Sequence, residues 1–328
     1  MAAGGQPDVG DVHVDTLLTN ISVAHQNALT GYVADQIFPL IPVGKQSDLY
    51  PTYTRGDFFA DEGDRMLRAP GTRAATTGFA VGTAGYHCLN YAIGMELPDE
   101  LRKNADSVFN LDNDATKLVT HMQMIRRERA FAAAFMAGSV WTGSSTAGDI
   151  TVSNKWSDYA ASDPFGDIDA EINAVEEATG MKPNKSLMGA IVWRRLKHHP
   201  DFIARISGGA TVNNPALLSL AQLAGMLELE TCLVGRAMYR SSNEGATLTL
   251  ARIIDDDMLL LYVPAGPSLL TPAAGYTFYW EPGAGGGIQY IRKYRLEPER
   301  TDVVEAYSYF DQVAVEAYAG AFIADCVD

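Results

Sequence analysis

A stretch of some fifty residues, 46–96, constrains the fold of this chain more than any other part of it. Two strands are predicted, because aromatic or aliphatic residues alternate with polar ones, regularly in the first half of the stretch and more loosely in the second. The aromatic and aliphatic positions are Tyr50, Tyr53, Phe58, Phe59, Phe79, Val81, Tyr86, Leu89 and Tyr91. A reversal between the strands is predicted by the turn residues Gly56, Gly63, Pro70 and Gly71. An arm of about twenty residues would reach about 60 Å. An isolated ribbon is marginally stable, and we see no apolar face wide enough to pack on its own subunit, so we expect other copies to complete it.

The length and composition are those of a globular protein with more than one compact part. At 328 residues the chain exceeds the size at which a single core stops growing, so we expect two compact parts with extensions. A hydrophobic fraction of 47% and a charged fraction of 20% argue against disorder. Cys88, Cys232 and Cys326 are too few and too scattered for a disulfide framework or a zinc knuckle, which favours a reducing compartment.

The charge and hydropathy patterns exclude several classes of protein. The sequence predicts neither a signal peptide nor a membrane span, because it has no basic N-terminal region before an apolar run and no uninterrupted run of eighteen apolar residues. A net charge of −15 disfavours a general grip on nucleic acid, since phosphate binding needs a basic surface. Residues 182–206 carry six Lys and Arg against one Asp, whereas residues 297–328 carry eight acids against one Arg. These segments are either solvated faces or complementary patches that meet between subunits.

Periodicity and chain breakers predict a series of helices. We expect a short helix near 22–37 in an N-terminal arm and a long helix at 112–137, which Asp112 caps and Gly138 ends. Further helices are expected at 167–179, where Gly180 closes the helix, and near 192–206 and 215–227. The long helix would measure about 39 Å. One apolar stripe is expected along it, because seven residues recur at spacings of three, four or seven: Leu111, Ala115, Leu118, Met122, Ile125, Ala132 and Met136.

Strands are expected mainly in the second half of the chain. Residues 247–254 and 258–263 predict a hairpin that turns at Asp255, Asp256 and Asp257, and further strands are predicted near 288–295 and 313–319. The three aspartates lack the glycine and glutamate continuation of an EF-hand, so a turn is favoured over a calcium loop.

Three parts of the sequence have a distinctive composition and order: FPLIPVGKQSDLYPTYTRGDFF at 38–59 with RAPGT at 68–72, LKHHPDFIARI at 196–206, and LLTPAAGYTFYW at 269–280. Each of them resembles a segment of the major capsid proteins of tailed bacteriophages. They occur in the family's order, and the similarity covers roughly residues 15–328. Three separate signatures in register are far more specific than any one short motif.

The resemblance implies the Hong Kong 97 phage capsid fold, an α+β fold with an N-terminal arm, an extended E-loop hairpin, a P domain on a long spine helix, and an A domain. Mapped onto this chain, it implies an N-terminal arm at 1–46, an E-loop hairpin at 47–97, a P domain at 98–181 with the spine helix at 112–137, an A domain at 182–295, and C-terminal strands at 296–328 that return to the P domain.

The resemblance also implies a structural protein and not an enzyme. It would assemble in the host cytoplasm, through pentamers and hexamers, into the icosahedral head of a virion, and would enclose double-stranded DNA without sequence-specific binding. An encapsulin-type nanocompartment shell, which shares the fold but holds a cargo enzyme, is the alternative. Expected partners are other copies of the chain, a portal and a decoration protein.

Two departures from some relatives refine these expectations. Some relatives cross-link their shells through a lysine in the E-loop, whereas this chain has no lysine between Lys45 and Lys103. The chain also lacks the long helical N-terminal extension that serves some relatives as a built-in scaffold. We therefore expect a shell without covalent cross-links and a separate scaffolding protein.

Charged residues of both signs interleave in the proposed E-loop, and they are Arg55, Asp57, Asp61, Glu62, Arg65, Arg68 and Arg73. Paired acids could serve as an acid/base dyad, but the interleaved arginines favour charge-matched contacts between subunits. We take these seven residues as candidate intersubunit contacts.

Other residues that could carry chemistry have simpler structural explanations. The glycine-rich run 283–287 leads into a predicted strand, whereas phosphate cradles open a helix. His198 and His199 would point about 100° apart near a helix end, and His87 and Cys88 would point to opposite faces of a strand. We expect no catalytic residue, cofactor or metal site.

Overall fold

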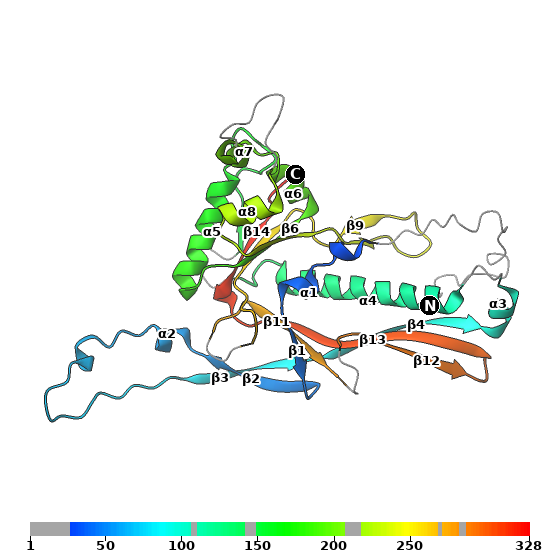
Figure 1. Cartoon of the computed structure of the whole chain (residues 1–328), viewed down its shortest axis with the longest axis horizontal. Helices are drawn as coiled ribbons and strands as arrows, with labels where there is room; N and C mark the ends of the chain where they lie inside the picture. Colours follow the sequence, from blue (N-terminus) through cyan, green and yellow to red (C-terminus); the bar gives the residue numbers. More distant parts are fainter. Residues whose placement is uncertain (1–26, 106–109, 142–148, 207–217, 268–270, 282–286) are drawn as a thin grey trace.

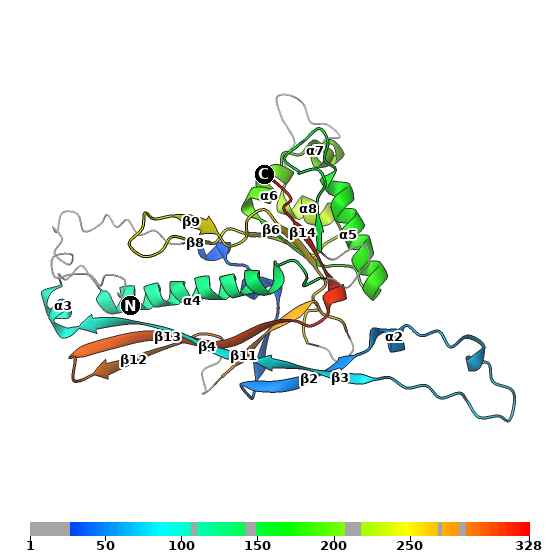
Figure 2. The ribbon, with the colours of Figure 1, turned by 180° about the vertical axis from the view of Figure 1, so that it is seen from behind.

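The computed structural model describes residues 27–105, 110–141, 149–206, 218–267, 271–281 and 287–328. Figure 1 shows an elongated molecule with three parts: a compact α/β part, a long helix along a sheet of long strands, and a projecting two-stranded hairpin. The reverse view in Figure 2 shows that the hairpin points away from the end of the molecule that carries the short helix α3 (Asp99–Asn104).

The long helix α4 (Leu111–Phe135) confirms the helix expected at 112–137. Its N-cap is Asn110, whose side chain accepts a hydrogen bond from the Asn113 N–H at 3.1 Å. The prediction of Asp112 as the cap was wrong. Asp112 lies inside the first turn, where its charge still suits the positive end of the helix dipole.

The buried face of α4 differs from the predicted apolar stripe. The predicted stripe residues Leu118 and Met122 are 43% and 41% exposed, whereas the buried residues are Ala115, Val119, Gln123, Arg127, Glu128, Phe131 and Phe135. The prediction was wrong because it assumed an entirely apolar buried face. Three buried positions are polar, and each of these side chains contacts polar groups within the fold.

One face of a five-stranded sheet lies against α4. Four strands follow the order β1-β11-β13-β12, and the fifth, β4, also pairs with β13; their bounds are β1 (Leu40–Val43), β4 (Leu89–Pro98), β11 (Gly275–Trp280), β12 (Tyr290–Leu296) and β13 (Thr301–Ala314). The core between helix and sheet contains Leu97, Ala115, Val119, Val304 and Ala306. At 14 residues, β13 is long enough to pair with β4 along one edge and with both β12 and β11 along the other.

A second five-stranded sheet forms the centre of the α/β part. Its order is β5-β14-β10-β6-β7, with β5 (Asp149–Thr151), β6 (Lys185–Gly189), β7 (Thr231–Gly235), β10 (Met258–Leu261) and β14 (Gly320–Ala324). Strand β10 is buried on both faces: Met258 and Leu260 contact one core, and Leu259 and Leu261 contact the other. A central strand between two apolar layers reads as a continuous apolar run, which explains its MLLL sequence.

Helices cover one face of the second sheet. They are α5 (Pro164–Thr179), α6 (Ala190–Leu196), α7 (Pro200–Ile206) and α8 (Leu220–Met226). The helix expected at 167–179 is confirmed, and Gly180 at φ +68° ends it. The region expected to be helical at 192–206 contains α6 and α7, and residues 215–217 of the last expected helix lie outside the described residues.

The opposite face of the second sheet packs on the C-terminal end of α4. Phe131, Phe135 and Trp141 share this core with Phe38 and with Phe322 of β14. The ring centroids of Phe38 and Phe135 lie 4.5 Å apart. Near this core the N-terminal segment forms two short helices, η3 (Leu29–Gly31) and α1 (Ala34–Ile37); residues 22–26 of the helix expected at 22–37 lie outside the described residues.

The predicted hairpin at 247–254 and 258–263 was wrong. Strand β9 (Leu250–Arg252) pairs with β8 (Met238–Arg240), whereas β10 pairs with β6 and β14. The segment between β9 and β10 therefore crosses from one sheet to another. Gly189 is required beside it, because a Cβ there would lie 1.6 Å from the carbonyl oxygen of Asp255.

The end of the chain also differs from the expected strands. Residues 313–319 were expected to form a strand, but β13 ends at Ala314 and a 3-10 helix, η5 (Ala317–Ala319), follows it. Strand β12 confirms the strand expected near 288–295. The two sheets also combine distant parts of the chain: β13 joins the sheet on α4, and β14 joins the sheet that contains β6, β7 and β10.

Candidate assembly surfaces

The projecting hairpin is built by β2 (Ser47–Tyr53) and β3 (Val81–His87). The strands pair antiparallel from Ser47 opposite His87 to Tyr53 opposite Val81. Figure 1 shows that the chain between them extends well beyond the rest of the molecule. The structure thus contains the hairpin expected from the alternating pattern.

The base of the hairpin packs on its own chain. The Tyr86 ring stacks on Phe278 of β11 with centroids 4.8 Å apart, and the Tyr50 ring lies 5.7 Å from the same phenylalanine. Residues 89–98 form β4 and pair with β13. The expectation that 46–96 has no apolar face wide enough to pack on its own subunit was therefore wrong for the hairpin base and for β4. The expectation fits the connection between β2 and β3 best.

That connection, residues 54–80, leaves large apolar side chains in contact with solvent. It includes the one-turn helix α2 (Arg55–Phe58) and the 3-10 helix η4 (Gly63–Met66). Met66 and Leu67 are 68% and 84% exposed. Phe58 and Phe79 contact each other and Tyr53, but both remain more than half exposed. An exposed group of large apolar residues is typical of a surface that binds another protein.

The seven predicted contact residues do not form one cluster. Arg65 pairs with Glu62 and reaches the carbonyl of Thr76 at 3.4 Å, while Asp57 and Asp61 accept hydrogen bonds from the N–H groups of Ala80 and Gly63. These four charged side chains therefore help to shape the connection itself.

The remaining three predicted contact residues are arginines in two different settings. Arg55 donates to the carbonyl of Ala178 and lies 3.8 Å from the ring centroid of Tyr318, so it holds the start of the connection against the body. Arg68 and Arg73 are exposed and make no ion pair with the described residues.

An apolar groove of about 470 Å³ lies where the hairpin meets the body. The hairpin side contributes Tyr50, Tyr53, Phe58 and Phe59, and the body contributes residues that include Met181 and Pro272. The Phe59 ring lies against Gly180 at the end of α5. The groove therefore has one wall from the projecting hairpin and one from the compact part of the same chain.

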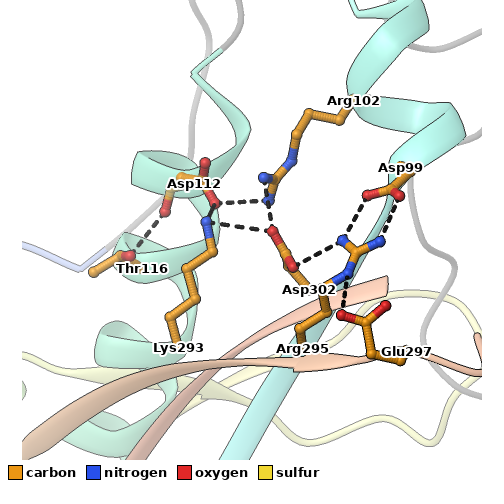
Figure 3. A network of polar contacts seen from close by, with 8 residues as sticks. All are labelled: Asp99, Arg102, Asp112, Thr116, Lys293, Arg295, Glu297 and Asp302. Atoms are coloured by element: carbon orange, nitrogen blue, oxygen red, sulfur yellow. Dashed lines mark hydrogen bonds and ion pairs between the residues drawn. The ribbon is translucent and has the colours of Figure 1, made fainter. Parts of the chain in front are cut away.

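A network of charged side chains ties the far end of α4 to the sheet, and Figure 3 shows its members. Arg295 of β12 binds both carboxylate oxygens of Asp99 at 2.9 and 2.7 Å and reaches Asp302 at 3.2 Å. Arg102 bridges Asp302 and Asp112 at 2.8 and 2.9 Å. The hydrogen bonds from Arg295 hold the pKa of Asp99 below its ordinary value. The network joins α3, α4, β12 and β13.

Acidic residues of the segment 297–328 form ion pairs within the subunit. Asp302 and Glu305 pair with arginines of their own chain, Asp325 pairs with Lys155, and Glu297 pairs with Arg295. In the basic segment 182–206, Lys182 pairs with Glu228. Several of these charges are thus matched within the subunit, which favours the interpretation as solvated faces.

The N-terminal segment is held to α4 by a buried carboxylate. Glu128 is 1% exposed, and its oxygens accept hydrogen bonds from the N–H of Val33 at 3.0 and 3.1 Å and from the N–H of Ala34 at 3.0 Å. Burial raises the pKa of Glu128 to about 7, against the opposing effect of these hydrogen bonds. The adjacent Arg127 pairs with Asp35. Glu128 thereby caps the short helix α1 from another element.

The sequence did not indicate this contact. A glutamate in the middle of a charged helical segment suggests a solvated side chain, and the predicted stripe placed the buried face elsewhere. The available signal is that Glu128 lies four and seven residues from Ala132 and Phe135, the spacing of one helical face.

The structure agrees with the expectation that His198 and His199 point in different directions, and that His87 and Cys88 do so as well. His199 is buried, with Nε2 3.0 Å from Ser162 Oγ, while His198 is exposed. His87 is exposed on β3 and the adjacent Cys88 is buried, so they do point to opposite faces. Burial raises the pKa of the Cys88 thiol to about 12 and also raises those of Cys232 and Cys326.

The described part of the chain contains neither a cluster of metal-binding side chains nor a membrane-spanning helix. Within those residues, no group of three or more His, Cys, Asp or Glu is placed to hold a metal ion, and no helix is long and apolar enough to cross a membrane. Asp257 accepts a hydrogen bond from the Asp325 N–H at 2.9 Å. Residues 283–286 of the glycine-rich run lie outside the described residues.

Comparison with curated proteins points to phage coats. The chain is 25% identical over 318 residues to a major capsid protein of Burkholderia phage BcepMu, covering 94% of this chain and 95% of that protein. It is also 25% identical over 240 residues to a major capsid protein of Pseudomonas phage JBD67, covering 73% and 74% of the two chains. No family model matches the chain.

Solved structures with the same fold include phage capsids. A phage-related protein from Bordetella bronchiseptica RB50 matches with a TM-score of 0.66 at 19% identity, covering 92% of this chain and 93% of that one. A subunit in the capsid of cyanophage P-SCSP1u matches with a TM-score of 0.60 at 12% identity, covering 98% and 96%. The protein therefore has the α+β, Hong Kong 97-like fold of phage capsid proteins, and the resemblance to phage major capsid proteins is confirmed.

Proposed function

We propose that this chain is a major capsid protein, which assembles in many copies into the icosahedral head of a tailed phage around double-stranded DNA. The observation that carries the proposal is the match to phage major capsid proteins along 94% of the chain, in a subunit of the same fold. The exposed connection at 54–80 supports it, because its apolar side chains gain most by contact with other copies.

The proposed parts of the subunit follow the family's architecture. The proposed division is an N-terminal arm at 1–46, an E-loop at 47–97, a P domain at 98–181, an A domain at 182–295 and C-terminal strands at 296–328, with two segments reassigned. The pairing of β4 with β13 favours assigning residues 89–97 to the P domain sheet, and the pairing of β14 with β10 favours assigning residues 320–324 to the A domain.

The proposed role is structural and not enzymatic. The similar curated proteins are coat proteins. Shell assembly in the host cytoplasm would use a separate scaffolding protein and a portal, with a decoration protein as a further candidate partner. A net charge of −15 suits a wall that encloses DNA without binding a particular sequence.

The contents of isolated particles test this proposal. Particles from cells that produce the complete phage should protect double-stranded DNA from added nuclease, and the same particles opened by heating before nuclease treatment should not. Particles that hold a packaged enzyme and no protected DNA would support an encapsulin-type compartment and would contradict the proposal.

A further inference from the structure

Strand β4 has a free edge that lacks the usual protection against pairing with another chain. Figure 1 shows β4 and β12 on either side of β13, and no other described strand pairs with β4. An unpaired edge is a template for a further strand, and proteins normally block such an edge with charged residues or proline. Strand β12 carries Arg292, Lys293 and Arg295. Strand β4 carries one charged residue, Glu96, and its only proline is the last residue, Pro98.

The backbone groups at this edge belong to alternate residues of β4. Gln123 of α4 donates hydrogen bonds to the carbonyl of Tyr91 at 2.8 Å and to that of Ala306 on β13 at 3.1 Å, so the Tyr91 carbonyl lies on the β13 side. In an antiparallel pair, the N–H and C=O groups of successive residues point to opposite sides of the strand. The groups that point away from β13 are therefore those of Asn90, Ala92, Gly94 and Glu96. All four of these residues are exposed.

A second copy of β4 matches this edge when it runs antiparallel and Ile93 lies on the two-fold axis. Ala92 then lies opposite Gly94 of the partner subunit, and both are small enough for a close approach. Asn90 lies opposite Glu96 of the partner subunit, so an amide donor meets a carboxylate acceptor. These opposed residues all direct their backbone groups across the contact, as hydrogen-bonded antiparallel pairs require.

Apolar side chains on the α4 side of β4 gain from the same arrangement. Leu89 and Ile93 are 49% and 37% exposed in the subunit. Ile93 lies opposite Ala306, which belongs to the core between α4 and the sheet, so Ile93 lies at the rim of that core. On the axis it meets Ile93 of the partner subunit and extends the core across the contact. Apolar burial of this kind stabilises by about 25 cal/mol per Å².

We propose that β4 pairs with β4 of a second copy across a two-fold axis, so that the sheets of the two subunits join into one. The contact is isologous, as a two-fold axis requires, because each copy offers the same surface. It uses β4 and no residue of the connection 54–80. The inference rests on the proposed function, because an icosahedral shell contains two-fold axes and this contact would occupy one of them.

A single introduced cysteine tests the contact and its register. In a non-hydrogen-bonded antiparallel pair the Cα atoms lie about 4.5 Å apart, a separation that suits a disulfide. Ile93→Cys should therefore give dimers, and no larger ladder, on a gel without reductant after mild oxidation of the concentrated protein. The matched control is Ile291→Cys on β12, where the isoleucine is 49% exposed, and it should stay monomeric. The native cysteines do not interfere because all three are buried.

A proline at the free edge gives an independent test. Proline is tolerated in an edge strand where the missing N–H would face away from the ladder. Ala92→Pro should keep the circular dichroism of the folded subunit and remove the dimer band of Ile93→Cys. It should also raise the protein concentration needed for assembly by about tenfold or more, since backbone hydrogen bonds across the contact are lost. Ala92→Ser keeps the N–H and should change this concentration little.

The outcomes separate this inference from the proposed function. Wild-type particles without a dimer band from Ile93→Cys, or with unchanged assembly of Ala92→Pro, would overturn the contact and leave the capsid function standing. Loss of the folded signal in Ala92→Pro would place the Ala92 N–H on the β13 side and would also overturn the contact. A dimer band from a chain that never forms particles would keep the contact and overturn the proposed function.

Discussion

Buried polar side chains of α4 fix how its neighbours lie against it. Gln123 donates to the carbonyls of Tyr91 and Ala306 and accepts from the Ser308 hydroxyl, so it joins the helix to β4 and β13. Glu128 joins the same helix to the N-terminal segment. A hydrogen bond sets direction as well as distance, so these two residues specify one arrangement of helix, sheet and arm.

Replacing Glu128 should destabilise the subunit. Glu128→Ala would leave the N–H groups of Val33 and Ala34 without their acceptor, at a cost of about 1–3 kcal/mol for each buried group. The midpoint of thermal unfolding should fall clearly. Glu100→Ala, an exposed glutamate in α3, is the matched control and should change the midpoint little. Equal effects of the two substitutions would contradict the assigned role of Glu128.

The same residue should make stability depend on pH. Its pKa is about 7 in the folded chain against an ordinary value of 4.5, so the folded state holds this proton more tightly than the unfolded state does. The contribution to stability is then fully present below about pH 4.5 and is lost as the pH rises through 7. Glu128→Gln should flatten the fall in the unfolding midpoint between pH 5 and pH 8. An unchanged pH profile in this variant would show that another group titrates.

At the scale of elements, the sequence predicted the helices and strands that have strong local signals. The long helix, the helix closed by Gly180 and the projecting hairpin were all predicted, because periodicity and chain breakers are local properties. The buried face of α4 and the partners of strand β10 were not predicted. Gln123 and Glu128 are buried through partners more than thirty residues away in sequence, which no periodicity reveals. Strand β10 was paired with the wrong neighbour because its true partners, β6 and β14, lie far away along the chain.

The candidate assembly surface was predicted only in part, because contacts between residues far apart in the sequence leave no local pattern. The charged residues of the connection were identified by composition, but the structure gives them different settings: Arg55 holds the body, Arg65 pairs with Glu62, and Arg68 is free of ion pairs with the described residues. The groove could not be predicted, because it is formed by residues 50–59 together with residues near 180 and 272.

Removing the connection should separate folding from assembly. Replacing residues 54–80 by a short glycine-containing turn keeps β2, β3 and the Tyr50 and Tyr86 contacts with Phe278. It also leaves β4 intact, which pairs with β13 along ten residues. The variant should show the circular dichroism of a folded subunit but form no particles. Loss of the folded signal would show that the connection belongs to the core.

At the scale of the whole molecule, the two sheets make the subunit one connected body. Strand β13 runs along α4, and the chain then passes through η5 into β14 at the centre of the α/β part. The C-terminal end of α4 packs into the core beneath that second sheet. The hairpin therefore projects from one continuously packed body. Such a body suits a subunit whose contacts with neighbouring copies must be held in fixed positions.

The mature shell should contain no covalent links between subunits. The hairpin has no lysine to form an isopeptide bond, and the three cysteines are buried. Apolar burial, at about 25 cal/mol per Å² of buried surface, is then the main stabilising term. Mature particles boiled in SDS without reductant should give a single band near 35.4 kDa. A ladder of larger bands would contradict this account.

Whether the purified chain assembles tests the central claim most directly. Electron microscopy and light scattering of concentrated protein should show large closed particles, or rings of the kind that build them, because the exposed apolar residues of the connection find partners in other copies. The replacement of residues 54–80 serves as the non-assembling control. A stable, monodisperse monomer of the wild-type chain at high concentration would contradict the proposal that this protein builds a shell.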